Sequence, residues 1–359
     1  GGAVAATFTT VQAGDWDAPA TWGGAVPSST DSAQIQHAVQ IWSTSEITNV
    51  VVLDGGSLAL AGSGSDLQYS GDITTVGTGT LNLAGDPGAT LTVAGSGSRN
   101  LPAITAFARV VVNPGCDASH NGDMTVSGLD IYGSFINQGG LVTQTGTDQV
   151  ITRDNGSASF GGTVNNFVVD TLAQFTLSQP LTVTGSWGDL STAGFNANGQ
   201  TVTISGGGTV TYTGTSVFGD LIIDGATFAV QTNSSLGYTG SVTAANGGLL
   251  DLQSELPTTL APTGGGVCAL PAATMLVNGV LGSVAGGTYA GALVGYNAAS
   301  GVVERVSSDS GVTGTGNVGA LVGSNAGTLS ESLATGSASG GLNGGGLAGS
   351  NTSTGTIRD

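Results

Sequence analysis

The middle of the chain repeats a short phrase in which one apolar residue stands between two small polar residues. Thr143–Thr145 and Leu221–Ile223 fall inside the two longer gaps between copies, and with them the period is about 18–20 residues. Alternation of this kind is typical of a half-buried β-strand. The pattern therefore predicts one short strand per repeat, with turns at the intervening Gly, Asn and Asp residues. The copies with Val at the centre are Thr125–Ser127, Thr163–Asn165, Thr182–Thr184, Thr201–Thr203 and Ser241–Thr243.

A stricter repeat occupies the C-terminal part of the chain. One seven-residue phrase occurs three times, as Gly291–Asn297, Gly319–Asn325 and Gly345–Asn351. The asparagines lie 28 and 26 residues apart, so each recurs once per repeat. The shared positions are the first Gly, the fifth Gly and the seventh Asn: Gly291, Gly295, Asn297, Gly319, Gly323, Asn325, Gly345, Gly349 and Asn351.

These residues resemble the GLUG repeat of bacterial surface adhesins, which is named for its Gly-Leu-hydrophobic-Gly core. Gly327–Gly336 also looks like the connecting segment of that family, and the resemblance covers roughly the last quarter of the chain. In the middle, Phe167–Asp170, Thr176–Gly185 and Asn198–Gly206 are similar to the repeats of bacterial β-solenoid surface proteins. Both resemblances imply a secreted protein of a bacterial cell surface.

The N-terminal stretch is rich in tryptophan. Trp16, Trp22 and Trp42 all fall within residues 1–45, and Gly14–Pro27 is similar to the Trp-rich entry segment of many secreted β-helix domains. We expect the three side chains to cap an open end of the core, because such an end must be shielded from water and from edge pairing. A surface that stacks against sugars is the alternative.

Repeats of this length without helical segments between them predict an all-β fold, a right-handed parallel β-helix (β-solenoid). The GLUG-type repeats would extend or follow it. Each coil would bury inward-facing Val, Leu and Ile against its neighbours. Equivalent residues would then stack, so Asn297, Asn325 and Asn351 are expected to form an amide ladder. An antiparallel sandwich is the competing fold, although its hairpins and aromatic core fit the pattern less well.

The same patterns divide the chain into four segments. Residues 1–45 form the entry or cap segment, and residues 46–255 form the solenoid of short repeats. Residues 256–271 are a junction that bears Pro and Gly, and residues 272–359 hold the GLUG-like repeats. The third copy is cut short, so we expect the chain to be a piece of a longer protein.

Composition agrees with a β fold and excludes several classes of protein. The chain of 359 residues has 64 Gly, and only 8% of its residues are charged, which disfavours helices. With 9 Pro and no three-residue Gly period it is not collagen, and with 39% hydrophobic residues it is not a disordered tail. A net charge of −18, with no Lys, argues against nucleic acid and anionic membranes as partners.

The sequence shows neither a membrane segment nor a targeting segment. No apolar run approaches the roughly 18 residues that a membrane-spanning helix needs, so we expect no membrane insertion here. There is no leader with a basic start and an apolar core, so any signal peptide is expected to have been removed or to lie outside this chain.

We expect no cofactor, with calcium as an open alternative. The acidic residues are scattered, which favours a role in solubility over a calcium site. Cys116 and Cys268, with His37 and His120, are too few for a zinc site. We expect both thiols to be unpaired and buried, and His120 to lie in an Asn–Gly loop. Two dinucleotide-type glycine patterns occur, but neither opens a helix, so that interpretation is rejected.

A polysaccharide lyase or glycoside hydrolase is the enzymatic alternative, because parallel β-helices often carry those activities. Asp15 with Asp17, or Asp220 with Asp224, could supply a carboxylate pair. No catalytic residue can be assigned from such pairs alone, and the enzyme alternative would gain if two or three Asp met an Arg in one groove. The arginines are scattered, as Arg99, Arg109, Arg153, Arg305 and Arg358.

The function that we expect is therefore structural and adhesive, in a rod or filament component of a bacterial surface. Its partners would be further copies of itself, glycans, or host and neighbouring cells. The Thr-rich phrases leave an ice-binding face as a minor alternative. We expect that array to be interrupted at Gln144, Asn165 and Ile223, and Thr is in any case favoured on strands.

Overall fold

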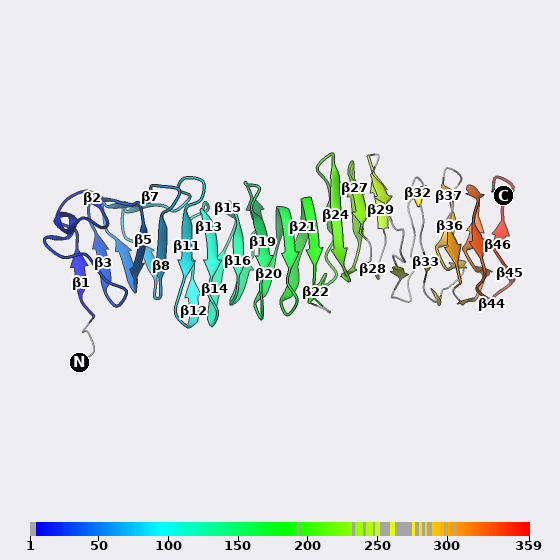
Figure 1. Cartoon of the computed structure of the whole chain (residues 1–359), viewed down its shortest axis with the longest axis horizontal. Coiled ribbons are helices and arrows are strands. Elements are labelled where there is room, and N and C mark those ends of the chain that lie inside the picture. Colours follow the sequence, from blue (N-terminus) through cyan, green and yellow to red (C-terminus); the bar gives the residue numbers. More distant parts are fainter. Residues whose placement is uncertain are drawn as a thin grey trace. The chain divides into compact units, whose positions relative to one another are not determined.

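The computed structural model is built almost entirely from short β-strands (Figure 1). The described residues divide into two compact units. Unit 1 comprises residues 1–165 and 172–175, and unit 2 comprises residues 166–171 and 176–359. The structure describes residues 5–191, 194–231, 234–239, 242–246, 248–251, 259–262, 275–276, 280–281, 284–285, 289–297, 299, 301–304, 306–309 and 311–359.

Unit 1 begins with two four-stranded parallel ladders. Each ladder takes one strand from each successive coil, so its strands lie one above the next although they are about 20 residues apart in sequence. A short 3-10 helix, η1 (Pro19–Trp22), follows the second strand. The first ladder is β1 (Thr7–Thr9), β3 (Ser32–Ile35), β6 (Asn49–Val52) and β9 (Ile73–Thr75). The second is β2 (Gly14–Asp15), β4 (Ala38–Ile41), β7 (Ser57–Leu60) and β10 (Thr80–Asn82).

Three further ladders run through the rest of unit 1, and all of their pairings are parallel. One contains β5 (Thr44–Ile47), β8 (Asp66–Tyr69), β11 (Thr90–Val93), β13 (Arg109–Val112), β16 (Leu129–Ile131) and β19 (Gln149–Thr152). Another contains β12 (Gly97–Asn100), β14 (Cys116–Asn121), β17 (Ser134–Gln138) and the start of β20 (Ser157–Val169). The last contains β15 (Met124–Val126), β18 (Val142–Gln144) and the middle of β20.

Unit 2 opens with parallel ladders that share the long strand β21 (Gln174–Asp189). One continues through β23 (Val202–Ile204), β26 (Leu221–Asp224) and β29 (Val242–Ala245). The other continues through β24 (Thr209–Gly214), β27 (Thr227–Val230) and β30 (Leu249–Asp251). The remaining strands here are β22 (Phe195–Asn196), β25 (Val217–Phe218), β28 (Ser235–Tyr238), β31 (Thr259–Pro262) and β33 (Val280–Leu281).

The GLUG-like repeats form coils of the same parallel kind, with several short strands per coil. The longest ladder is β32 (Met275–Leu276), β37 (Val302–Glu304), β42 (Thr328–Ser330) and β47 (Thr356–Arg358). The three-stranded ladders are β34 (Val284–Ala285), β39 (Val312–Gly314), β44 (Ala338–Gly340); β35 (Tyr289–Gly291), β40 (Asn317–Gly319), β45 (Asn343–Gly345); and β36 (Val294–Asn297), β41 (Val322–Asn325), β46 (Ala348–Asn351). The strands β38 (Ser307–Ser308) and β43 (Leu333–Ala334) pair alone.

The parallel β-solenoid predicted from the repeats is therefore confirmed, and the antiparallel sandwich is wrong. Side chains alternate between core and surface along the strands, as in β7, where Leu58 and Leu60 are buried and their neighbours are half-buried. Apart from η1, the described residues form no helix. The predicted division into four segments stays a prediction, because most of residues 256–271 lie outside the described residues.

The predicted alignment is wrong in at least two places. The phrase Leu221–Ile223 is out by one residue, because Val202 pairs with Leu221 rather than with Ile222. The phrase pattern matches Thr182–Thr184 with Thr201–Thr203, but in the structure Thr182 pairs with Thr203, which is a shift of two residues. A shift of two keeps every side chain on its own face of the sheet, so hydrophobic burial does not distinguish the two registers. Gln144 and Ile223 also lie at buried positions, so they do not interrupt an outward Thr array as expected.

The few aromatic residues are concentrated inside the coils rather than spread over the surface. In unit 1, Phe160 lies between Phe135 and Phe175, with ring centroids 6.0 and 4.7 Å away. In unit 2, Trp187 contacts Phe167 at 4.6 Å and Phe218 at 5.1 Å. These large side chains lie in the core, and the edge-to-face contacts of Phe160 add to the stabilisation from burial.

Candidate functional site

The repeat positions of the GLUG-like coils stack in register. Gly319 pairs with Gly291 on one side and Gly345 on the other, and the three glycines are the last residues of β40, β35 and β45. Asn325 pairs in the same way with Asn297 and Asn351, in β36, β41 and β46. The equivalent residues of the three copies therefore occupy one place in successive coils.

The amide ladder predicted for the asparagines is present. Nδ2 of Asn297 donates to Oδ1 of Asn325 at 2.6 Å, and Nδ2 of Asn325 donates to Oδ1 of Asn351 at 2.8 Å. Each amide also donates to backbone carbonyls near it, such as that of Thr328 or Gly327. Asn297 and Asn325 are buried, so these bonds satisfy polar groups that water does not reach. The ladder therefore has a structural role, because its amide groups are engaged in hydrogen bonds within and between the coils.

The glycines of the repeat are explained by close approach of backbone. A Cβ on Gly319 would lie 2.0 Å from the carbonyl oxygen of Val322 in its own coil. A Cβ on Gly323 would lie 2.6 Å from Ala290 N and from Gly295 O in the preceding coil. Contacts this short do not occur in folded proteins, so both positions need Gly. The glycines that resemble the GLUG core therefore permit the tight coil rather than contact a ligand.

Two of the three N-terminal tryptophans are buried together. Trp16 and Trp22 are 1% and 5% exposed, and their rings meet edge to face at 5.0 Å. Nε1 of Trp22 donates to the carbonyl oxygen of Trp16 at 2.7 Å. Trp42 differs, because it is 53% exposed and its Nε1 donates to Oδ1 of Asp15 at 3.0 Å. A sugar could therefore stack only on Trp42, and the cap stays a prediction.

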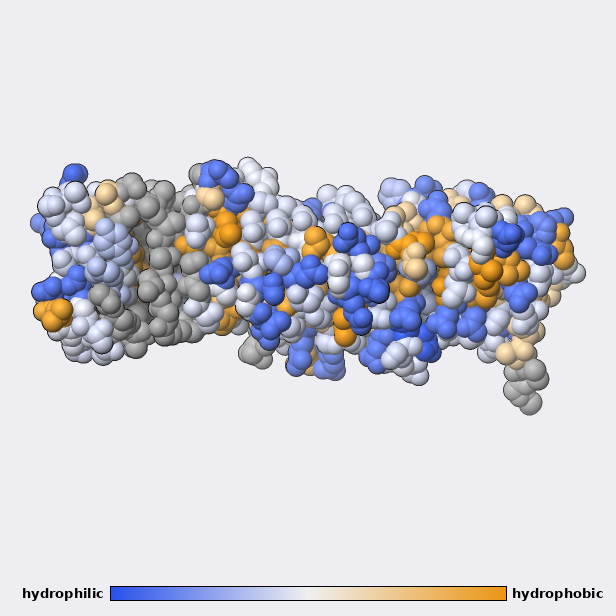
Figure 2. Space-filling view, turned by 180° about the vertical axis from the view of Figure 1, so that it is seen from behind, coloured by the Kyte–Doolittle hydropathy of each residue, from blue (hydrophilic) through white to orange (hydrophobic). Residues whose placement is uncertain are grey.

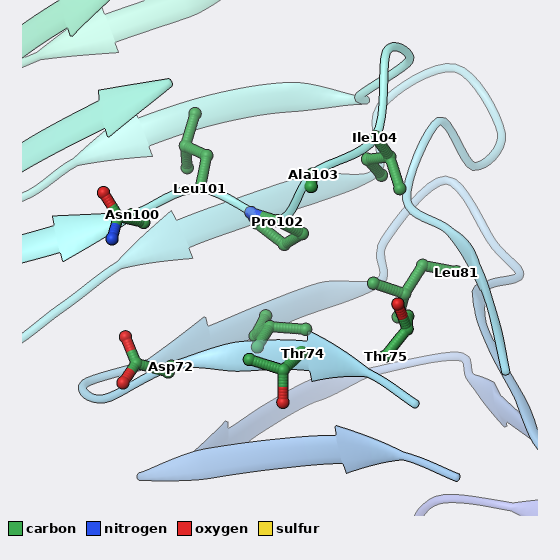
Figure 3. Close-up of a pocket in the computed structure, with 10 residues that line it drawn as sticks. Asp72, Thr74, Thr75, Leu81, Asn100, Leu101, Pro102, Ala103 and Ile104 are labelled. Atoms are coloured by element: carbon green, nitrogen blue, oxygen red, sulfur yellow. The ribbon is translucent and has the colours of Figure 1, made fainter. Parts of the chain in front are cut away.

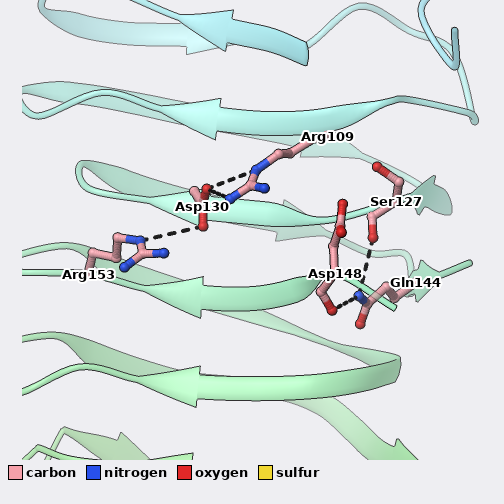
Figure 4. A network of polar contacts seen from close by, with 6 residues as sticks. All are labelled: Arg109, Ser127, Asp130, Gln144, Asp148 and Arg153. Carbon is pink, nitrogen blue, oxygen red and sulfur yellow. Dashed lines mark hydrogen bonds and ion pairs between the residues drawn. The ribbon is translucent and has the colours of Figure 1, made fainter. Parts of the chain in front are cut away.

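The strongest charged cluster among the described residues lies on the strands β13 and β16 and just after β19, in unit 1 (Figure 4). Asp130 is 5% exposed and stands between Arg109, from the coil before, and Arg153, from the coil after. Nε of Arg109 donates to Oδ2 of Asp130 at 2.9 Å, and Nη2 of Arg109 contacts the same oxygen. Nε of Arg153 lies 3.5 Å from Oδ1, an ion pair that is longer than a hydrogen bond.

The surroundings hold the two guanidinium groups in place. Cζ of Arg153 lies 5.7 Å from the centre of the Tyr132 ring, a cation–π contact. Burial alone would lower the pKa of Arg109, but the hydrogen bond and the charges of Asp130 and Asp148 outweigh it, so this pKa is raised. Arg109 therefore stays cationic and cannot serve as a proton acceptor at neutral pH.

Next to this cluster, the side chain of Gln144 forms hydrogen bonds with backbone groups of neighbouring turns (Figure 4). Its Nε2 donates to the carbonyl oxygens of Ser127, at 3.2 Å, and of Asp148, and its Oε1 accepts from the backbone N–H of Asn165 at 2.8 Å. The cluster meets part of the condition set for an enzyme, since it brings Asp130 near two arginines and Asp148 near Arg109. Asp130 is nevertheless buried and paired, which leaves Asp148 as the exposed carboxylate.

A second buried carboxylate lies in unit 2. Asp189 is 2% exposed, and it accepts hydrogen bonds from the hydroxyl groups of Ser191 and Ser216, the latter at 2.5 Å. Oγ of Ser216 also lies 3.2 Å from Nε1 of Trp187, which donates to it. These groups satisfy one another inside the core, so the cluster has a structural role.

The remaining chemically capable residues are also engaged in internal contacts. His37 contacts Thr10 through Nδ1 at 3.1 Å. His120 lies in strand β14 and not in a loop as expected, because the loop begins only after Asn121. Its ring is 4% exposed and contacts Oδ1 of Asn137 and the carbonyl oxygen of Ile104, both at 3.1 Å.

The thiol of Cys116 is free and buried, and burial raises its pKa, which makes it unreactive. Cys268 lies outside the described residues, as does Arg305. In the part of the chain that the structure describes, no three His, Cys, Asp or Glu side chains gather as metal ligands would.

The carboxylate pairs considered in the sequence take part in local contacts. In the first pair, Asp17 accepts a hydrogen bond from Oγ of Ser43, and Asp15 accepts the bond from Trp42. In the second, Asp224 accepts from Nδ2 of Asn246.

None of the helical segments among the described residues has the length and apolar character of a bilayer-spanning helix.

The Arg109–Asp130–Arg153 cluster was not predicted from the sequence, because the arginines are far apart along the chain. The available signal was spacing, since Arg109 and Asp130 are 21 residues apart, which is about one coil. Comparison with known proteins adds no function to this description. No family model, no curated protein and no solved structure matches the chain.

Proposed function

We propose that this chain is a structural and adhesive β-solenoid of a bacterial surface, which acts through its lateral surfaces rather than by catalysis. The observation that carries the proposal is the internal use of its polar groups. The Asn297–Asn325–Asn351 ladder and the ion pairs of Asp130 all link one coil to the next. Polar and charged side chains thus stabilise the contacts between coils, as expected of a rod that presents a surface to partners.

The surface supports shallow contacts with partners. On the face in Figure 2, hydrophobic and hydrophilic residues are interspersed in small patches. Outward positions in neighbouring strands also repeat, as Thr125, Thr143 and Thr163 do across β15, β18 and β20. Repeated groups on a long surface can bind repeated ligands such as glycans with useful avidity although each contact is weak.

Adhesion is tested by coating beads with the purified chain and measuring their retention on immobilised neutral and uronate-containing glycans and on bacterial cells. We expect retention above that of beads coated with an unrelated acidic protein. Retention no greater than that control on every surface would overturn the adhesive role. Self-association, the second part of the proposal, predicts fibres or multimers in electron micrographs, and strictly monomeric particles at high concentration would contradict it.

A polysaccharide lyase or hydrolase is the second candidate, favoured by the two arginines and two aspartates of Figure 4. The chain would be incubated with uronate-containing and neutral polysaccharides while new unsaturated or reducing ends are measured. Product formation by the chain that is lost in Asp148→Asn would replace the structural proposal by an enzymatic one. The absence of product on the whole panel would remove this candidate.

The ice-binding alternative is tested by measuring thermal hysteresis. In register, Thr182 and Thr203 are followed by Ile222, so the outward Thr array is broken in unit 2. We therefore expect no hysteresis from the purified chain. A clear hysteresis gap would restore this alternative.

A further inference from the structure

The first ladder of unit 1 ends earlier than its neighbour. The strand β9 is the last of the β1-β3-β6-β9 ladder. The neighbouring ladder continues past β10 through two single bridges, from Leu83 to Phe107 and from Ala106 to Thr125. Residues 101–105, which follow in the next coil, form an irregular segment and not a strand. Within the described residues, the first ladder therefore does not continue past β9.

Pro102 lies in this irregular segment and disfavours a strand there. Proline has no backbone N–H and cannot donate to a ladder, so it is excluded from central strands. The segment turns sharply here, because the backbone N–H of Ile104 donates to the carbonyl oxygen of Pro102 at 2.8 Å. The strand that would cover β9 is therefore replaced by a turn.

The outer edge of β9 consequently lies open. Towards β6, Asp72 O accepts from Val50 N and Val76 N donates to Val52 O, both at 2.8 Å. Backbone groups alternate in direction along a strand, so the N–H and C=O groups of Ile73 and Thr75 point away from β6. Within the described residues β9 has a strand partner on one side only. An edge of this kind is a template for another strand.

A cavity of about 430 Å³ lies along this edge, between β9 and residues 100–104 (Figure 3). Asp72 and Asn100 are at one end of it, and Leu81 and Ile104 are at the other. Pro102 contributes an apolar wall in the middle, and it is buried. The volume is in the range of ligand sites in proteins.

We propose that this cavity binds an extended peptide segment, which adds to β9 as a parallel or antiparallel strand. The N–H and C=O groups of Ile73 and Thr75 would pair with the peptide backbone, as in other cases of strand addition. Alternate peptide side chains would lie against Pro102 and Leu81, so apolar residues are preferred there. The strand β9 has 3 residues, so at 3.2–3.4 Å per residue its open edge is about 10 Å long and pairs with about three residues of peptide.

The chemistry of the lining favours a basic peptide over a sugar. None of the cavity's lining residues is aromatic, so a sugar ring has no surface on which to stack. Asp72 is exposed at one end, and the chain carries a net charge of −18. A partner segment with Lys or Arg beside an alternating apolar stretch therefore matches both the edge and the charge. This inference does not depend on the adhesive function.

The test uses a fluorescent, end-capped hexapeptide of alternating Lys and Val, titrated with the chain and followed by anisotropy at low salt. Thr75→Pro removes one N–H that points into the cavity and leaves the bonds to β6 intact. We expect it to weaken binding about tenfold or more, as the loss of a backbone bond and of strand geometry implies. A peptide N-methylated at alternate residues on the side that faces β9 serves as the matched ligand control and should not bind.

The role of charge is tested separately with Asp72→Asn. This variant should bind the Lys-Val peptide about threefold more weakly and should bind a Ser-Val peptide as tightly as the unchanged chain does. Asp86→Asn, which removes an exposed carboxylate elsewhere in unit 1, should have no such selective effect. Equal binding of the N-methylated and unmethylated peptides, or no binding at all, would overturn the proposal. Displacement of the peptide by monosaccharides would do the same, as would dimerisation of the chain through this edge that Thr75→Pro abolishes.

Discussion

The side-chain amide of Asn325 donates from Nδ2 to Oδ1 of Asn351 at 2.8 Å, across two neighbouring coils of the GLUG-like repeats. Its own Oδ1 accepts from Nδ2 of Asn297 at 2.6 Å. Asn325 has no exposed surface, so neither bond can be replaced by water. A buried amide that donates one way and accepts the other fixes the register of three coils at once.

Replacing Asn325 by Ala is therefore expected to destabilise the repeats by about 1–3 kcal/mol, because the buried amide of Asn297 loses its partner. Asn325→Asp should cost more at neutral pH, since a buried carboxylate would face the carbonyl oxygens of Gly327 and Thr356. Urea unfolding followed by circular dichroism measures both.

The control is Asn343→Ala in the next coil. Nδ2 of Asn343 donates to Oδ1 of Asn317 at 2.8 Å, but this pair is exposed. Its loss should change the free energy of unfolding by less than about 0.5 kcal/mol. If Asn325→Ala and Asn343→Ala were equally mild, the buried ladder would not be a source of stability.

Gly323→Ala tests the close approach of coils. The added Cβ would lie 2.6 Å from Ala290 N and Gly295 O, both of which are backbone atoms that cannot rotate away. We expect a loss of about 1–3 kcal/mol or more in the free energy of unfolding, and faster hydrogen exchange of the amides in β36 and β41.

The matched control for this change is Gly344→Ala, since a Cβ at Gly344 would meet nothing within 4 Å. This substitution should be neutral or slightly stabilising, because Ala lowers the entropy of the unfolded chain. A Gly323→Ala variant as stable as Gly344→Ala would mean that the coils can separate without cost.

The GLUG-like coils were predictable because their repeat is marked by residues with no substitute. Gly319 and Asn325 have equivalents at the same place in each copy. A Cβ at Gly319 would clash with backbone, and the amide of Asn325 must meet those of its neighbours, so these residues determine which positions pair between coils. In the middle of the chain the repeated phrase is Thr-Val-Thr, which matches itself after a shift of two residues. Burial alone could not choose between Thr201 and Thr203 as the partner of Thr182.

The features that could not be predicted depend on where single residues fall within a coil. Phe135 and Phe160 are 6.0 Å apart although 25 positions separate them, and no phrase marks either one. The open edge of β9 lies beside the irregular segment that holds Pro102, whose position in the coil is known only once the register is known. A period sets which coils are neighbours, but irregular residues within a coil decide where sites form.

The ion pairs of Asp130 should be unequal in strength. Arg109→Gln is expected to cost about 1–2 kcal/mol, and Arg153→Gln less, because Arg109 makes hydrogen bonds to Asp130 whereas Arg153 lies 3.5 Å away. Both arginines are about one-third exposed, which reduces either value below that of a fully buried pair.

A double-mutant cycle measures this directly, with Asp130→Asn combined with each arginine variant in urea unfolding. Arg99→Gln is the control, because Arg99 donates only to backbone carbonyl oxygens such as that of Ser70 at 2.6 Å. Its coupling to Asp130→Asn should be close to zero. A coupling for Arg153 as large as that for Arg109 would contradict the geometry.

The carboxylate of Asp31 should make the N-terminal coils sensitive to acid. It accepts from Oγ of Ser28 at 2.6 Å and from the backbone N–H groups of Ala6 and Ser28, each at 2.8 Å. These bonds hold the pKa of Asp31 below its ordinary value of 3.8, and the bond from the Ser28 hydroxyl is the largest cause. The folded state thus binds this proton less readily than the unfolded state.

A lowered folded-state pKa means that the stabilisation is complete above the unfolded value and is lost as pH falls through the folded value. Asp31→Asn should therefore lower the urea midpoint at about pH 7, and the gap from the unchanged chain should narrow at about pH 4 and close further near pH 2.5. Asp86→Asn, which removes an exposed carboxylate, controls for the general relief of negative charge. A gap between Asp31→Asn and the unchanged chain that stays constant over this range would show that the carboxylate contributes through shape alone and not through its charge.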